Sequence, residues 1–289
     1  MQKRWRLQLT LGTAWNTNVT YRPQEAVRAV GERADRQAPS GTLAFDGGYT
    51  LWQQGPARVD ATFSLSEVQY RHLERFARTN MSVGLEMTRE FEGWRAWATP
   101  MVQKGLVDHD NYRTAFALSL GLEKPLASWC SVQGNYALNA AHYHFRAIKD
   151  EELDGATHHF AIGPRLWTPG GRLAGYAQVT FDEARHAGDA MQHKALGAEL
   201  GVNVKLLSTL GLNSSLTLLR PDYTKKNLRH PTNLKRADRT AIWYTALVYQ
   251  LRKNQQIELF YSYVHNHSNI RRFYKYDQRQ IGMYYRYMF

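Results

Sequence analysis

The feature that most constrains this chain is a two-residue alternation of apolar and polar side chains. From Leu196 to Leu206, every even position is apolar, whereas the odd positions hold glycine, glutamate, asparagine or lysine. The same pattern recurs at 81–88 and 43–51. Since a period of two places alternate side chains on opposite faces of an extended chain, these segments are predicted to be β-strands with one apolar face.

About fourteen such segments cover the chain, and each is long enough for the roughly 9–11 residues with which a tilted strand crosses a bilayer. No run of about 18 apolar residues occurs, which excludes a membrane-spanning helix. We therefore expect an all-β fold: a transmembrane, up-and-down, antiparallel β-barrel of about 14 strands, forming a single domain over residues 1–289. The predicted strands are 4–16, 41–52, 57–67, 80–90, 93–102, 112–123, 127–143, 157–167, 172–182, 193–206, 210–220, 239–252, 255–264 and 278–289.

The predicted connections alternate between short and long. This alternation sorts the two kinds to opposite ends of the barrel, as in outer-membrane proteins with short periplasmic turns and long extracellular loops. With an even strand number, both termini are expected in the periplasm of a Gram-negative bacterium. The wall is then expected to contact outer-membrane lipid and lipopolysaccharide. The predicted long loops are 17–40, 68–79, 103–111, 144–156, 183–192, 221–238 and 265–277.

The chain ends in an alternating aromatic strand. Tyr285, Tyr287 and Phe289 share one face, and Gln280 and Gly282 share the other. The order Gln280-x-Gly282-x-x-Tyr285-x-Tyr287, followed by Phe289, resembles the C-terminal signal that is read by the barrel-assembly machinery of the outer membrane. We therefore expect that machinery among the partners of this chain.

Two motifs, together with the expected strand count, resemble the C-terminal barrel of the surface lipoprotein assembly modifiers (Slam), which are outer-membrane translocons. The first motif closes the first predicted strand and reads Leu9-x-Leu11-Gly12-x-x-x-Asn16-x-Asn18-Val19. The second leads into the last predicted strand and reads Ser268-Asn269-Ile270-x-x-Phe273-Tyr274-x-Tyr276-Asp277-x-x-x-Ile281-Gly282.

The resemblance implies a translocon that delivers surface lipoproteins, or related secreted haem- or metal-acquisition proteins, to the cell surface with the help of a periplasmic chaperone. It implies no catalytic residue and no cofactor. Slam proteins carry an N-terminal periplasmic domain of tetratricopeptide repeats, and no helical repeat of about 34 residues occurs here. We therefore expect this chain to correspond to the barrel without that domain. Polysaccharide exporters share the same ending, so an exopolysaccharide-exporting or passive porin-like barrel remains the alternative.

The polar faces of the predicted strands are expected to line the barrel interior. Their charges are of both signs, which suits a wetted passage or a network of internal ion pairs, and most of them are expected to pair with one another. A sugar passage is instead expected to show charges of one sign and stacked aromatic rings. The candidate lumen-lining residues are Arg6, Asp46, Arg58, Asp60, Glu86, Gln178, Glu199, Lys205, Glu258 and Arg286.

Lysine and arginine number 37 against 25 acidic residues, which gives a formal net charge of +12. Part of this excess lies in two predicted outer loops. Lipopolysaccharide phosphates are the nearest polyanion to such loops, and contact with an emerging client protein is the alternative. Nucleic acid is not an expected partner, because it does not explain the strands. The basic outer-loop candidates are Lys225, Lys226, Arg229, Lys235, Arg236, Arg271, Arg272 and Lys275.

A histidine-rich segment raises the alternative of an outer-membrane enzyme. His267 and Ser268 are adjacent, and adjacent residues of a strand point to opposite faces, so the contact between a nucleophile and its base is not expected. A metal site is a further alternative, although the lone Cys130 and the absence of an HExxH motif favour ordinary interfacial histidines. The histidines concerned are His142, His144, His158 and His159.

Overall fold

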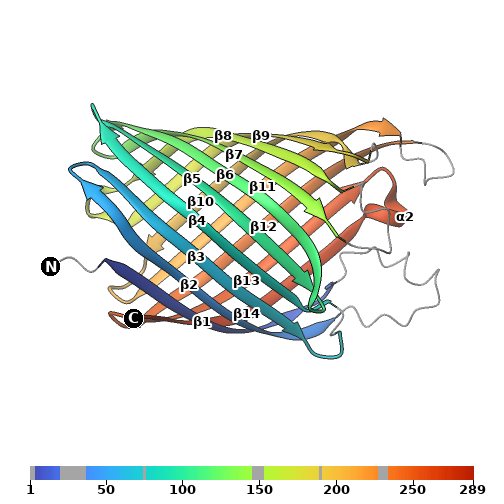
Figure 1. The fold of residues 1–289 in the computed structure, drawn as a ribbon, viewed down its shortest axis with the longest axis horizontal. Helices are drawn as coiled ribbons and strands as arrows, with labels where there is room; N and C mark the ends of the chain where they lie inside the picture. Colours follow the sequence, from blue (N-terminus) through green and yellow to red (C-terminus); the bar gives the residue numbers. More distant parts are fainter. Residues whose placement is uncertain (1–3, 20–36, 74–75, 145–152, 189–190, 227–233) are drawn as a thin grey trace.

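The chain forms a closed barrel of fourteen antiparallel strands, in which β1 (Trp5–Asn16) pairs with β14 (Tyr276–Met288) (Figure 1). This computed structural model describes residues 4–19, 37–73, 76–144, 153–188, 191–226 and 234–289. Each strand pairs with its neighbours in sequence, so the topology is up-and-down throughout. The predicted all-β barrel and its strand number are thus confirmed.

The remaining strands are long and strongly tilted against the barrel axis (Figure 1). Besides them, the described residues contain η3 (Pro169–Gly171) and α2 (Arg271–Tyr274) as short helices. None of the described helices has the length and apolarity needed to cross a bilayer. The strands are β2 (Ala38–Gln54), β3 (Ala57–Tyr70), β4 (Arg78–Phe91), β5 (Trp94–Val107), β6 (Asp110–Ala127), β7 (Cys130–Tyr143), β8 (Gly155–Trp167), β9 (Leu173–His186), β10 (His193–Lys205), β11 (Leu210–Lys226), β12 (Lys235–Arg252) and β13 (Gln255–Ser268).

The alternation in sequence corresponds to the two faces of the barrel wall. On β1, Thr10 and Ala14 are buried on the inner face, whereas Leu11 and Trp15 are about half exposed on the outer face. The same division continues around the wall, where Val83, Ile162 and other large apolar side chains are exposed. Large apolar side chains are exposed around the outer wall, as in barrels whose outer face meets hydrocarbon instead of water.

The two ends of the barrel differ in their connections. The start of β1, the end of β14 and the short turns lie at one end, which we call the turn end; α2 and the longer connections lie at the other, the loop end (Figure 1). The turn end includes the tight turn at Gly55, which has a positive φ of 54°. The predicted sorting of short and long connections is therefore present, with one exception at the loop end.

That exception is the connection between β5 and β6, where the predicted long loop at 103–111 is wrong. The strands continue to Val107 and resume at Asp110, so only Asp108 and His109 form the turn. Both have positive φ, 51° and 65°. Two successive residues in this region make the tight hairpin whose twist matches paired strands, and aspartate tolerates it better than most residues.

Most strands also reach farther toward the loop end than the alternation predicts. β2 begins at Ala38 instead of residue 41, and β11 ends at Lys226 instead of residue 220. Pairing requires only backbone hydrogen bonds, so strands continue beyond the apolar band, where both faces are polar and the alternation disappears.

Candidate functional site

The register of the strands places every candidate lumen-lining residue on the inner face of the wall. Asp46 lies opposite Gln8 of β1 and Ser64 of β3, and Ser64 Oγ donates a hydrogen bond to its carboxylate at 2.6 Å. Gln178 lies opposite Glu199. Lys205 is exposed at the turn end of β10 and has the same parity as Glu199. The candidates therefore share one continuous surface, the interior of the barrel.

Four of them form one ion network near the turn end. Arg6 Nη2 lies 2.7 Å from Glu86 Oε2 and 3.6 Å from Asp60 Oδ2, and Arg58 Nη2 lies 2.8 Å from the same Asp60 oxygen. The Arg6 side chain is 58% exposed, whereas that of Asp60 is only 5% exposed. Charges of both signs are therefore paired along the wall, and the outermost of them remain accessible to water.

A glycine makes this network geometrically possible. Arg6 is on β1 and Glu86 on β4, so the arginine must cross β2 and β3. It crosses at Gly48, where an added Cβ would stand 2.8 Å from Arg6 Nε. The absence of a side chain at Gly48 lets the guanidinium lie flat against the wall instead of projecting across the interior.

A second network joins β12, β13 and β14. The Glu258 side chain, 8% exposed, accepts a hydrogen bond from Tyr244 Oη at 2.6 Å and pairs with Arg286 Nη1 at 2.7 Å. Beside it, the ring of Phe260 stacks on that of Tyr284 with centroids 4.7 Å apart and planes 7° apart. Phe260 itself is only 5% exposed. These rings are consequently packed against each other and against the wall, and they present little aromatic surface to the interior.

Sequence reasoning missed the inner side chains that pair with two glutamates of the inner face, Glu199 and Glu123. Tyr176 Oη donates to Glu199 Oε1 at 2.6 Å, and Ser131 Oγ donates to Glu123 Oε1 at 2.6 Å. Arg165 Nη1 lies 3.6 Å from the same oxygen of Glu123. Tyr176, Ser131 and Arg165 have the parity of the inner face within their strands, so the alternation itself was the signal that could have identified them.

Among the basic outer-loop candidates, Arg236 is not a surface charge, and the prediction is wrong for this residue. Its side chain is 13% exposed and forms an ion pair with Asp238. Its guanidinium carbon lies 4.2 Å from the ring centre of Tyr223 and 3.5 Å from that of Tyr274. The reason is that β12 begins at Lys235, which places the even-numbered Arg236 on the inner face. The other described side chains, those of Lys225, Lys235, Arg271 and Lys275, are exposed; Arg229 and the side chains of Lys226 and Arg272 lie outside the described residues.

The residues of the predicted C-terminal signal divide between the two faces of β14. Gln280 and Gly282 face inward, while Tyr285, Tyr287 and Phe289 face outward. The rings of Tyr287 and Phe289 meet edge to face at 4.8 Å. The Phe289 amide donates to the Leu7 carbonyl oxygen at 3.0 Å, so the last residue is tied to β1.

Of the candidate histidines, His142 and His144 lie together with ring centres 4.6 Å apart, and His142 pairs with Asp154. Ser268 is fully buried on the inner face, where its Oγ accepts a hydrogen bond from the Ile270 amide, whereas His265 and His267 lie on the outer face. His158 and His159 likewise point to opposite faces, and His159 pairs with Asp182. No group of three or more histidine, cysteine or carboxylate side chains suited to a metal ion occurs among the described residues.

No protein-family model matches this chain, and no curated protein matches it significantly in sequence. Solved structures do match in fold. The in-vitro folded OmpT, an outer membrane protein of Vibrio cholerae, superposes with a TM-score of 0.55 at 8% identity, covering 100% of this chain and 99% of that one. CdiB from Acinetobacter baumannii gives 0.54 at 8% identity, covering 99% and 60%. OccAB3 from Acinetobacter baumannii gives 0.50 at 8% identity, covering 99% of each chain. At this identity the likeness concerns the fold alone, and nothing in it is specific to Slam: the chain has the fold of bacterial outer-membrane β-barrels.

Proposed function

We propose that this chain is a porin-like channel of the outer membrane of a Gram-negative bacterium, which conducts small polar solutes and holds both termini in the periplasm. The observation that carries this proposal is the contrast between the two faces of the wall. The outer face exposes large apolar side chains, whereas the inner face carries charges of both signs that water reaches, such as Arg6 at 58% and Glu86 at 38% exposure. A barrel closed by a packed core would bury such side chains.

The arrangement of the inner charges favours small solutes. Arg58, Asp60, Glu258 and Arg286 are paired along the wall, so they contribute local dipoles more than a field of one sign. A polyanionic or polycationic chain would be attracted by an interior of the opposite sign, and this interior is mixed. The stacked Phe260 and Tyr284 are packed together, which gives a polysaccharide little ring surface to slide on. A passive channel for small solutes therefore fits this interior better than a passage for a charged polymer or a polysaccharide.

Solute uptake into liposomes tests the proposal. Proteoliposomes that contain the refolded barrel are diluted into isotonic solutions of neutral sugars of increasing size, and swelling is followed by light scattering. We expect swelling that slows as the sugar becomes larger. Swelling no faster than that of protein-free liposomes, with a barrel shown to be folded by its heat-modifiable migration in gels, contradicts the proposal.

A second candidate is the protein translocon that the Slam resemblance implies, and one observation favours it. Residues of the two Slam-like motifs meet where the barrel closes. Asn18 Nδ2 donates to the Asp277 carbonyl oxygen at 3.1 Å, and Gln278 Nε2 donates to Asn16 Oδ1 at 3.1 Å. The β1–β14 pairing runs from Gln8 and is extended to Leu7 by the Phe289 amide, whereas β1 pairs with β2 from Trp5 onward. This shorter seam is the place at which a client would leave the barrel sideways.

The translocon candidate has its own test. In a Cys130→Ala background, cysteines replace Leu11 and Tyr285, which face each other across the seam. Surface display of a co-expressed lipoprotein is measured on intact cells with an antibody, with and without oxidation. Display that depends on the barrel and stops on oxidation supports lateral release of a protein client. If surface display of every lipoprotein tested is the same with and without the barrel, the translocon candidate is excluded and the channel remains.

A further inference from the structure

The outer wall carries a groove near the loop end, across β10, β11, β12 and β13. It has a volume of about 670 Å³. Its apolar side is formed by outward side chains of small and medium size, among them Leu196, Ala198, Leu218 and Ala241. Leu196 is 63% exposed, so the apolar part of the groove is open to whatever surrounds the barrel. Its apolar lining and open side suit a hydrocarbon chain.

Two arginines stand at the loop-end side of this groove. Leu219 pairs with Thr240, so Arg220 and Arg239 are direct neighbours across the β11–β12 ladder, and Arg239 lies opposite His267. Both arginines are exposed. Within the described part of the chain neither of them has an ion pair. Like charges directly opposite each other are unfavourable in a sheet unless an anion lies between them.

Two outward aromatic residues indicate at which level of the membrane the row formed by Arg220, Arg239 and His267 lies. Trp243 and Tyr263 face each other on the outer wall, four residues along their strands from Arg239 and His267 and closer to the middle of the barrel. Tryptophan and tyrosine concentrate at the membrane–water interface. The arginine row therefore lies just outside the apolar band, at the height of lipid phosphates, with the groove running from that height into the hydrocarbon.

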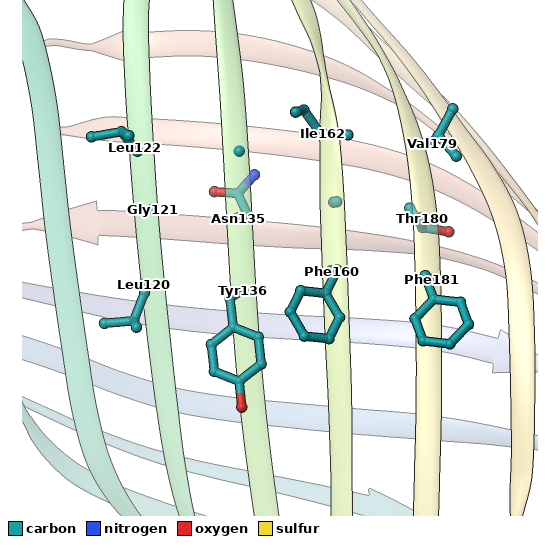
Figure 2. Close-up of a pocket in the computed structure, with 12 residues that line it drawn as sticks. Leu120, Gly121, Leu122, Asn135, Tyr136, Phe160, Ile162, Val179, Thr180 and Phe181 are labelled. Atoms are coloured by element: carbon teal, nitrogen blue, oxygen red, sulfur yellow. The ribbon is translucent and has the colours of Figure 1, made fainter.

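A second groove on the same wall provides the comparison. It lies across β6 to β9, where Figure 2 shows Tyr136, Phe160 and Phe181 side by side on neighbouring strands. No charged side chain lines it, and Gly134 leaves open space in which a Cβ would meet no atom within 4 Å. Apolar grooves thus occur at more than one place on the outer wall. The two neighbouring arginines distinguish the first groove from the second.

We propose that the groove beside Arg220 and Arg239 is a binding site for lipopolysaccharide, with the phosphates of its lipid A disaccharide on the two arginines and an acyl chain along Leu196, Ala198, Leu218 and Ala241. Charge complementarity selects an anionic amphiphile, and guanidinium groups match phosphate oxygens in pairs. The choice of lipopolysaccharide rests on the proposed placement in the outer membrane, because the loop end then lies in the outer leaflet. His267, opposite Arg239, adds a third donor to the row.

The test uses the full chain refolded in detergent, with lipid A as the probe and binding measured by native mass spectrometry and by the shift in melting temperature. The double variant Arg220→Gln/Arg239→Gln is expected to bind lipid A about thirtyfold more weakly, since each basic residue near an anionic lipid surface contributes about fivefold and the two factors multiply. Arg89→Gln is the matched control, an exposed outward arginine at the opposite end of the barrel. It is expected to leave binding unchanged.

A second pair of variants addresses the acyl chain without touching a charge. Ala241→Leu fills the arginine groove and is expected to weaken binding, whereas Gly134→Leu fills the uncharged groove and is not. A folded double-arginine variant that binds lipid A as tightly as the natural chain overturns the proposal, and so does equal binding of phosphatidylglycerol at the same site. Because binding is measured in detergent, it does not depend on conduction: a barrel that binds lipid A and conducts nothing refutes the channel and not this site.

Discussion

The indole ring of Trp97 on β5 lies flat across Gly121, its partner residue on β6. A Cβ at Gly121 would overlap the six-membered ring of Trp97, so the glycine is the space in which the ring rests. Tyr176 covers Gly201 and Tyr284 covers Gly12 in the same way. Large inward rings are thus folded down against the wall at glycine positions, which keeps them out of the barrel interior.

The replacement Gly121→Ala is expected to lower the free energy of unfolding by about 1–3 kcal/mol, the usual cost of overpacking, because a rigid indole must leave its place. Gly105→Ala is the control on the inner face, since a Cβ there meets nothing closer than 3.5 Å. Urea unfolding followed by tryptophan fluorescence measures both variants. Equal free energies of unfolding for Gly121→Ala and Gly105→Ala would show that the Trp97 ring does not require a glycine at residue 121.

The two inner ion networks are expected to differ in their contribution to stability. Arg286→Gln leaves the nearly buried Glu258 without its cation, which costs about 2–4 kcal/mol, in the range for broken buried pairs reduced for partial exposure. Arg6→Gln removes a partner that is more than half exposed, which costs less than about 1 kcal/mol. Unfolding of both variants in urea, against the natural chain, checks the order. A larger loss for Arg6→Gln than for Arg286→Gln would contradict it.

Arg236 is expected to stabilise the loop end of the barrel. Arg236→Gln removes the charge between Tyr223 and Tyr274 and strands the buried Asp238, which is expected to lower the free energy of unfolding by about 3 kcal/mol. Lys235→Gln, at the exposed neighbouring position, is the control and is expected to change little. Thermal unfolding measured by circular dichroism compares the stability of the two variants. If Arg236→Gln were as stable as the natural chain, the buried contact would not stabilise the loop end.

The sequence predicted the barrel, its strand number and the inner face because all three follow from one physical cause, hydrocarbon on one side of the wall. Glu258 and Glu199 could be assigned inward from their parity alone. The strand ends could not be predicted at the loop end, because beyond the apolar band Asp222 and Ala237 pair through backbone groups that leave no trace in the alternation.

The pairings within the candidate site needed information that the alternation does not contain. Arg6 and Glu86 come from strands that are not neighbours, and their contact depends on Gly48 between them. The alternation predicts a strand start at residue 239, whereas β12 begins four residues earlier, at Lys235. Arg236 therefore falls outside the predicted strand, and parity assigns a face only to residues within a strand.

If the predicted C-terminal signal is correct, Phe289 is expected to serve assembly more than stability. Its side chain is 49% exposed on the outer face, so Phe289→Ala removes little packing. In cells, we expect this variant to accumulate unassembled in the periplasm, whereas in detergent it should refold like the natural chain. Fractionation of the cells and the shift in gel migration on heating report the two properties. Normal assembly in cells would remove the role of this residue in the C-terminal signal.

Ion conduction through the purified barrel in a planar lipid bilayer tests whether the barrel interior is an open path. We expect stepwise current increases, and a reversal potential in a salt gradient that moves toward cation selectivity for Arg6→Glu, because this accessible charge borders the passage. Arg89→Glu, at the same end but on the outer face, should leave the reversal potential unchanged. Insertion of folded barrels without any current, or equal shifts for both variants, would contradict the claim that the inner wall lines an open path.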